Sequence, residues 1–425
     1  MIHIHGAAQI ATLGGASTKP KTGKEMEELG LIEDGGIVIE DGIFVFVGSS
    51  GEASRYVEEH SGDKPVTVLS AAGKTVTPGL IDPHTHIVFA GSREFELNLR
   101  LQGAKYLDIL QAGGGILYTT ERTREATEEQ LMAETVRRLD RFLAHGVTTI
   151  EAKSGYGLRL TDELKQLRVA RRLDAAHPVE LVSTFMGAHA VPAEYKGDAD
   201  AFVRTVTQEM IPAVAREGLA EFCDVFCEEG VFTVEQSRDI LEAGIRWGLK
   251  PKIHADELVS CGGAELAAEL GAVSADHLLH ASKDGIQQMA EQGVIAVLLP
   301  GTAFFLMAPP ADARAMINAG VPVALSTDRN PGSSPTESLP FIMNLACLTM
   351  RMTPAEVLTA CTINAAHAIG RAASIGSIEV GKQADLVMFD APNYLYMQYH
   401  YAVNLTDTVL KKGEVMIRDR KRVLE

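Results

Sequence analysis

The segment at positions 78–86 reads Pro-Gly-Leu-Ile-Asp-Pro-His-Thr-His and joins a short apolar run to two histidines. Alternate side chains of an extended chain point the same way, so His84 and His86 present their imidazole rings on one side. We therefore expect a strand at 80–82 that leads into two possible metal ligands. The spacing alone is a weak signal, because His3 and His5 repeat it with no further donor close by in the sequence.

Seven further β-rich runs follow, and most of the intervals between them suit amphipathic helices, such as 128–144 and 161–173. Repeated alternation of strand and helix predicts a parallel sheet, and eight strands are the number that closes into a (β/α)8 barrel. The eight expected strands lie at 80–82, 147–150, 180–185, 222–226, 251–253, 272–275, 294–299 and 321–326.

The two ends of the chain have a different pattern, in which short alternating runs are separated by Gly and Asp. Residues 1–77 and 376–425 are typical of antiparallel strands with tight turns, and each end alone is too small for a stable sheet. We expect both ends to form one composite β-sandwich domain beside a barrel at 78–375. The predicted fold class is α/β, a TIM-like barrel with this small second domain.

Charge and composition limit the possible partners. The 425 residues include 56 acidic and 39 basic side chains, which gives a formal net charge of -17. Such a surface repels phosphate backbones and anionic lipids, so neither nucleic acid nor a membrane is an expected partner. A small anionic substrate would need a specific cation in its pocket. The five cysteines contain no C-x-x-C pair, which favours a reducing, cytoplasmic location.

Three more potential ligands stand at the ends of expected strands. His254 ends the fifth strand, His277 the sixth and Asp328 the eighth. The carboxyl ends of barrel strands meet at the rim where barrel active sites lie, so these side chains should converge with His84 and His86. Singly, each is more often structural. Together, His84, His86, His254 and Asp328 predict a site for one divalent metal ion, with one position left for water.

This arrangement resembles the metal-dependent amidohydrolase superfamily, whose barrels carry H-x-H after strand one, His after strands five and six, and Asp after strand eight. The resemblance extends into both flanks, through GKTVTPG at 73–79 and GSIEVGKQADLV at 376–387. Some members hold two metals bridged by a carboxylated lysine on strand four, but the segment 221–230 contains no lysine. The resemblance therefore implies a mononuclear centre with zinc or iron, and it suggests a homodimer.

Five phrases resemble one branch of this superfamily more closely. The resemblance implies hydrolytic ring opening of 4-imidazolone-5-propanoate to N-formimidoyl-L-glutamate, a step of histidine breakdown. It also implies that substrate or product is contacted by Arg93, Tyr156, His189, Glu257, Asn330, Gly332 and Ser333. The phrases are HTHIVFAGSREFE at 84–96, EAKSGYGL at 151–158, FMGAHAVP at 185–192, IHADEL at 253–258 and DRNPGS at 328–333.

The chemistry of several of these residues agrees with those roles. The guanidinium fork of Arg93 suits a carboxylate tail. We expect Asp328 and His277 to accept the proton of the attacking water and Glu257, three residues beyond His254, to protonate the leaving ring nitrogen. Which of His277, Asp328 and Glu257 is the general base stays open.

Two other functions remain open at this point. The same metal chemistry would serve a mononuclear purine or pyrimidine deaminase, although Arg93 and Tyr156 count against it. A barrel that had lost catalysis and acts as a scaffold would be expected to lack metal ligands, whereas the full set is present.

Overall fold

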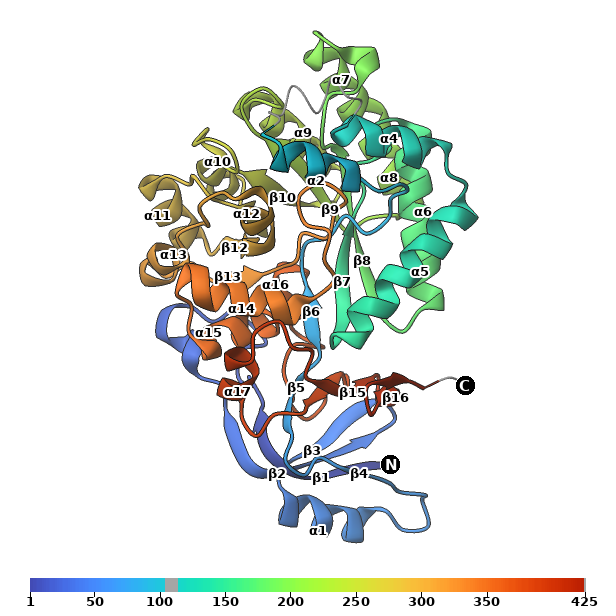
Figure 1. The fold of residues 1–425 in the computed structure, drawn as a ribbon, viewed down its shortest axis with the longest axis vertical. Coiled ribbons are helices and arrows are strands. Elements are labelled where there is room, and N and C mark those ends of the chain that lie inside the picture. Colours follow the sequence, from blue (N-terminus) through green and yellow to red (C-terminus); the bar gives the residue numbers. More distant parts are fainter. Residues whose placement is uncertain (104–113, 424–425) are drawn as a thin grey trace.

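Eight parallel strands form a barrel in the middle of the chain, and each pairs with the next in sequence order (Figure 1). The structure is a computed structural model and describes residues 1–103 and 114–423. A parallel bridge between Thr85 and Arg329 links the first strand to the last and nearly closes the barrel. The strands are β6 (Leu80–Asp82), β7 (Val147–Lys153), β8 (Glu180–Ala188), β9 (Phe222–Cys227), β10 (Lys250–Ala255), β11 (Ser274–His277), β12 (Ile295–Leu298) and β13 (Val323–Leu325).

All eight predicted barrel strands are confirmed. Every residue of β7, β11 and β12 is buried, as expected for parallel strands that are covered on both faces. The helix predicted at 128–144 is α5 (Glu128–Ala144), which begins at a capping box between Thr127 and Gln130 and buries Leu139 and Phe142. The helix predicted at 161–173 is the longer α6 (Leu160–Ala176).

The remaining helices of this region lie around the outside and at the ends of the barrel (Figure 1). They are α2 (Glu94–Leu101), α4 (Ile116–Glu125), α7 (Ala199–Thr205), α8 (Ile211–Glu217), α9 (Val234–Arg246), α10 (Gly263–Glu269), α11 (Lys283–Gln292), α12 (Pro300–Leu306), α13 (Ala313–Ala319), α14 (Leu339–Met350), α15 (Pro354–Ala360) and α16 (Ile363–Ala368). No described helix has the length and apolar character needed to cross a membrane.

Both ends of the chain contribute to a second sheet of nine strands. The N-terminal part supplies β1 (Ile2–Ala11), β2 (Leu31–Glu40), β3 (Ile43–Ser49), β4 (Thr67–Ser70) and β5 (Thr75–Pro78). The C-terminal part supplies β14 (Leu386–Phe389), β15 (Thr406–Lys411), β16 (Glu414–Arg418) and β17 (Lys421–Arg422), with α17 (Tyr394–Tyr399) between the first two. The pairing of β14 with β5 joins the two ends.

The pairing in this composite sheet differs from the prediction in two respects. The predicted sandwich has two packed sheets. Instead, hydrogen bonds connect the nine strands into one continuous sheet. The strands are also not all antiparallel, because β1 pairs in parallel with both β4 and β5. Helix α1 (Ser50–His60) is the physical reason: it separates β3 from β4, and such a crossover lets the chain return in the same direction.

The composite sheet lies at the amino-terminal end of the barrel, because β5 leads directly into β6 (Figure 1). The sheet has its own apolar core, which includes Ile4, Phe44 and Leu386. Lys411 of β15 links the two parts. Its Nζ lies 2.7 Å from Asp385 Oδ2 and 3.2 Å from Glu180 Oε2 at the start of β8.

We expect Lys411→Met to lower the free energy of unfolding by roughly 3 kcal/mol, the lower end of the range for breaking a buried ion pair, because Glu180 is partly solvated. Urea denaturation measures the change. Lys412→Met is the matched control, since the neighbouring Lys412 is exposed. Equal stability of the two variants would contradict a linking role for Lys411.

Candidate functional site

Four predicted ligands meet at the carboxyl end of the barrel. His84 and His86 follow β6, His254 lies in β10, and Asp328 follows β13. The Nε2 atoms of His86 and His254 are 3.4 Å apart. Asp328 Oδ1 lies 3.5 Å from His84 Nε2 and 3.9 Å from His86 Nε2. All four residues are buried. The structure thus brings together the residues that the sequence analysis selected as one set.

These distances fit a divalent metal ion. Tetrahedral coordination with bonds of about 2.0–2.2 Å places ligand atoms roughly 3.3–3.6 Å from one another. The buried Nε2 of His84 has no hydrogen-bond partner in the described part of the chain, which is costly for a polar atom unless something else satisfies it. His277 offers a further donor, because one of its ring nitrogens lies within 4.8 Å of ligand atoms of His84 and His254.

The charge state of the rings also suits metal binding. Burial lowers the pKa of His84, His86 and His277 well below the ordinary value, and neighbouring cationic groups lower it further. These imidazoles are therefore neutral at pH 7, which is the form that binds a metal ion. Burial raises the pKa of the Asp328 carboxyl to about 6, against hydrogen bonds that lower it.

Carboxylates behind the rings fix their orientation. Asp276 Oδ2 lies 2.6 Å from His84 Nδ1, and Asp224 Oδ1 lies 3.1 Å from His254 Nδ1. A carboxylate at Nδ1 holds the proton there and leaves the Nε2 lone pair free to face the centre. The Thr302 hydroxyl donates to Asp328 Oδ2 at 2.6 Å. The sequence analysis missed these three residues.

A signal for the two aspartates was present in the sequence. Asp224 interrupts the apolar run of β9, and Asp276 lies in β11, whose four residues are all buried. A charge inside a strand that is buried on both faces needs a buried partner, which marks the position as special. Thr302 carries no comparable signal. Two site residues, His277 and Asp328, also have positive φ angles of 75° and 51°, a conformation that non-glycine residues seldom adopt outside constrained sites.

Glu257 faces the centre next to His277. Its Oε1 lies 3.6 Å from His277 Nδ1, just beyond hydrogen-bond distance. Burial raises the pKa of the Glu257 carboxyl to about 8, and the charges of Asp328 and Glu228 contribute to the increase. Glu257 therefore holds a proton at neutral pH. A protonated carboxyl beside a neutral imidazole is an arrangement that can both donate and accept protons.

Tyr156 and His189 form a wall beside the rings. The His189 ring stacks on His86 with centroids 4.6 Å apart, and Tyr156 lies against His86 at 5.7 Å. His189 Nδ1 lies 3.1 Å from the carbonyl oxygen of Gly155. Burial lowers the pKa of His189 to about 3, so this ring is neutral as well.

Arg93 lies close to the loop 328–333. Its guanidinium makes two hydrogen bonds to Glu96, of 2.7 and 2.8 Å, and a Cβ atom placed on Gly332 would collide with it. Within the loop, Asn330 Oδ1 accepts hydrogen bonds from the amides of Gly332 and Ser333, both at 2.8 Å. The polar groups of Asn330 thus hold the loop in shape.

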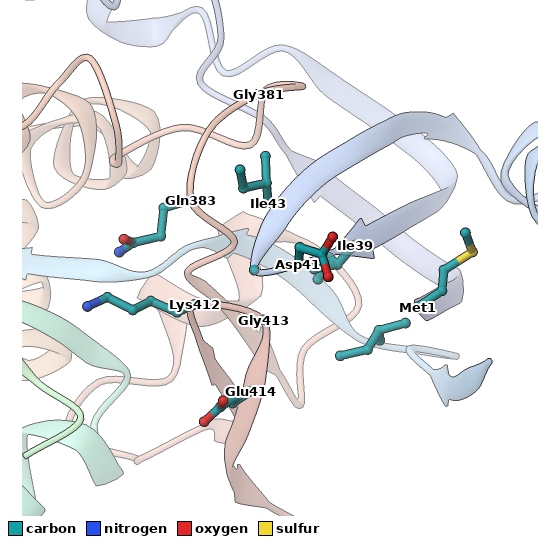
Figure 2. Close-up of a pocket in the computed structure, with 11 residues that line it drawn as sticks. Met1, Ile39, Asp41, Ile43, Gly381, Gln383, Lys412, Gly413 and Glu414 are labelled. Atoms are coloured by element: carbon teal, nitrogen blue, oxygen red, sulfur yellow. The ribbon is translucent and has the colours of Figure 1, made fainter. Parts of the chain in front are cut away.

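Two pockets differ in their chemistry. One of about 520 Å³ is lined by Arg93, Gly332, Phe89 and five further arginines: Arg100, Arg137, Arg138, Arg141 and Arg329. The other, of about 590 Å³, lies in the composite sheet (Figure 2). Asp41 of the β2–β3 hairpin lines it, as do Lys412 and Glu414 of the β15–β16 hairpin. No histidine lines this second pocket. Only the first pocket shares residues with the predicted site.

Comparison with known proteins gives a consistent family. The chain matches the amidohydrolase family over residues 75–416. It is 67% identical to an imidazolonepropionase of Shouchella clausii (strain KSM-K16) over 417 residues, which is 98% of this chain and 93% of that protein. It is 60% identical to an imidazolonepropionase of Geobacillus kaustophilus (strain HTA426), covering 99% of each chain.

Solved structures share the fold at much lower identity. Zinc-bound atrazine chlorohydrolase from Arthrobacter aurescens TC1 has a TM-score of 0.73 at 16% identity, covering 100% of this chain and 97% of its own. A zinc-bound adenosine deaminase from Xanthomonas campestris has a TM-score of 0.69 at 18% identity, covering 99% and 94%. At these identities the likeness establishes the barrel architecture and does not establish a substrate.

The donor set predicts how metal binding responds to two neighbouring substitutions. We expect His86→Ala to weaken binding of a divalent metal by more than roughly 100-fold. This exceeds the loss caused by removing a residue that only hydrogen-bonds to a metal ligand. His189→Ala is the control, because its ring stacks on His86 but its Nδ1 lies against Gly155. Competition with a chromophoric chelator measures both affinities. Unchanged affinity in His86→Ala would exclude that ring from the ligands.

Proposed function

The chain belongs to the imidazolonepropionases of the amidohydrolase family, and we propose that it hydrolyses 4-imidazolone-5-propanoate to N-formimidoyl-L-glutamate at this centre. The observation that carries the proposal is the convergence of His84, His86, His254 and Asp328 beside an arginine-lined pocket. The centre suits attack on a ring carbonyl, and the pocket suits the propanoate tail. The chain is accordingly a metal-dependent hydrolase.

We propose that His84, His86, His254 and Asp328 hold one divalent metal ion, zinc or iron. When bound, the metal would act as a Lewis acid that activates water and polarises the ring carbonyl. Three imidazoles and a carboxylate accept several first-row metals, so availability in the cell decides among them. The identity of the ion is therefore a matter for metal analysis of the purified protein.

His277 and Asp328 are proposed to receive the proton of the attacking water. His277 ends β11 and Asp328 follows β13, with β12 between these strands. The His277 ring is neutral, so its lone pair is available for a proton. Thr302 fixes the Asp328 carboxylate through its outer oxygen, which keeps the inner oxygen turned toward the centre. A base held in one orientation loses little entropy when the proton moves.

Glu257 is proposed to deliver the proton that the departing ring nitrogen requires. Its carboxyl is protonated at neutral pH because burial raises its pKa to about 8. After transfer, the carboxylate can recover a proton from His277, whose Nδ1 is 3.6 Å away. Breaking the carbon–nitrogen bond thus needs no proton from bulk solvent at that moment.

Arg93 is proposed to bind the propanoate carboxylate and so align the ring with the centre. Its pocket is lined by six arginines and by three glutamates, Glu94, Glu96 and Glu134. The excess of guanidinium groups supports an anionic substrate in a protein of strongly negative net charge. Tyr156, His189, Asn330, Gly332 and Ser333 are proposed to complete the contacts. The adenosine deaminase neighbour shares the fold alone.

We also propose a homodimer in the cytoplasm, with the small anionic substrate as the ligand and with neither nucleic acid nor membrane as a partner. The negative net charge supports the last part of this proposal. All five cysteines are free in the structure, which is compatible with a reducing compartment.

The direct test supplies freshly prepared 4-imidazolone-5-propanoate and follows the loss of its ultraviolet absorbance. We expect metal-replete protein to consume it, chelator-treated protein to stop, and added metal to restore the rate. Guanine and cytosine serve as controls, from which no ammonia should be released. Failure of the metal-replete protein to consume the propanoate would reject the proposal.

The raised pKa of Glu257 predicts an alkaline limit to the reaction. An acid must carry its proton to act, so the rate should fall as pH rises through a pKa of about 8, or a lower pH if a bound cation stabilises the carboxylate. We expect Glu257→Gln to lower kcat by about 10²–10⁴-fold and to abolish this alkaline limb of the pH–rate profile. The exposed Glu229→Gln should keep the limb. If the alkaline fall in rate persists in Glu257→Gln, another group must cause it.

A further inference from the structure

A cluster of five charged side chains lies inside the barrel beneath the candidate metal centre. It comprises Glu151 and Lys153 of β7, Asp224 of β9, Lys252 of β10 and Asp276 of β11. All five are buried. Burying this many charges is expensive unless they satisfy one another, so their arrangement requires an explanation. Neither Lys153 nor Lys252 has a role in the chemistry proposed above.

Lys153 is the centre of this cluster. Its Nζ lies 2.7 Å from Asp224 Oδ2, 3.3 Å from Asp276 Oδ2 and 3.1 Å from a Glu151 oxygen. The side chain therefore reaches from the second barrel strand to the fourth and the sixth. An ammonium group has three donors, and here each has a carboxylate within reach.

Two of these carboxylates hold histidines of the proposed metal centre. Asp224 divides its oxygens, since Oδ1 contacts His254 Nδ1 and Oδ2 contacts Lys153. Asp276 contacts His84 Nδ1 and Lys153 through the same oxygen, Oδ2. One ammonium group thus stands behind both carboxylate–histidine pairs.

The geometry around this ammonium resembles a cation site. Asp224, His254 and Asp276 bring ligand atoms within 4.8 Å of one another, close enough to hold a metal ion. Lys153 Nζ already contacts both carboxylates of this group. The positive charge that these carboxylates attract is therefore supplied by the chain itself.

We propose that Lys153 is a positioning residue of the metal centre, because it holds Asp224 and Asp276 in the orientation that aligns the rings of His254 and His84. The proposal rests on the proposed function in one respect: the centre must bind a divalent metal. Lys153 does not touch the ring nitrogens that would face the metal, and it acts through the two carboxylates. Its loss should therefore weaken metal binding even though all proposed ligands remain.

The rival explanation is that Lys153 only neutralises buried charge and stabilises the barrel. Lys252 separates the two explanations, because it is equally buried and also contacts Glu151, at 2.9 Å. Its other polar contact is the carbonyl oxygen of Pro83, at 3.4 Å. No ion pair joins Lys252 to Asp224 or Asp276 within the described structure. Removing Lys252 thus deletes a buried charge without releasing either carboxylate.

The experiment compares Lys153→Met with Lys252→Met in the full-length protein. Each protein is stripped of metal and titrated with zinc against a chromophoric chelator, and the unfolding midpoint of the metal-free form is recorded separately. We expect Lys153→Met to bind zinc about 10–100-fold more weakly than wild type, as when a residue that supports a metal ligand is removed. Lys252→Met should keep the wild-type affinity. The cobalt(II) spectrum should change in Lys153→Met alone, and Lys153→Arg should recover part of the affinity.

Wild-type zinc affinity in Lys153→Met, or an equal loss in Lys252→Met, would overturn the role of Lys153. If Lys153→Met does not fold, Lys153→Met/Glu151→Gln removes one charge of each sign and leaves Asp224 and Asp276 in place, so wild-type zinc affinity in that variant would overturn the role of Lys153. If neither folds while Lys252→Met does, the lysine serves folding and the proposal is wrong. Wild-type protein that binds no divalent metal would instead reject the proposed function.

Discussion

The burial of charge at the carboxyl ends of the barrel strands is the constraint on which the rest of the site depends. Parallel strands deliver their last side chains to one rim, and the side chains that point into the packed barrel below that rim are shielded from solvent. Each charged group must therefore find a partner of opposite charge or a hydrogen bond. Asp224, Asp276 and Lys153 satisfy one another, and the rings of His84 and His254 are oriented as a result.

The same constraint explains which proton transfers the site can support. No lysine or arginine of the described residues forms an ion pair with Glu257, so burial favours its protonated form. Asp224 is also buried, but the neighbouring His254 and Lys153 hold the pKa of its carboxyl well below the ordinary value. Two acidic residues on or just after adjacent strands therefore carry different charges at the same pH. Differences of this kind assign one carboxyl to proton delivery and another to orientation.

The sequence predicts the barrel well and places the four candidate ligands at its rim, because both inferences depend on local signals. Eight apolar runs separated by helical patterns define the strands, and a donor at the end of a strand can be placed on the rim without knowing any contact. Lys153 could not be placed in this way. Its partners lie on strands two and four positions away around the barrel, and only a closed sheet shows that one side chain reaches both.

The composite sheet shows a second limit of sequence-based reasoning. Alternating runs at the chain ends indicate strands but not their direction, and the parallel pairing of β1 with β4 depends on a helix that the pattern did not reveal. The roles of loop residues are similarly ambiguous. Asn330 is proposed to contact the substrate, and its side-chain oxygen also accepts two hydrogen bonds that shape its own loop, a role that the sequence does not reveal.

The union of both chain ends in one sheet has a consequence for biosynthesis. Strand β5 pairs with β14, so that Pro78 lies opposite Leu386. On the ribosome, the N-terminal strands emerge long before their partners are translated, and they expose an unpaired edge during that interval. The sheet can be completed only after residues 386–422 have been made, so its completion must follow the synthesis of the whole barrel.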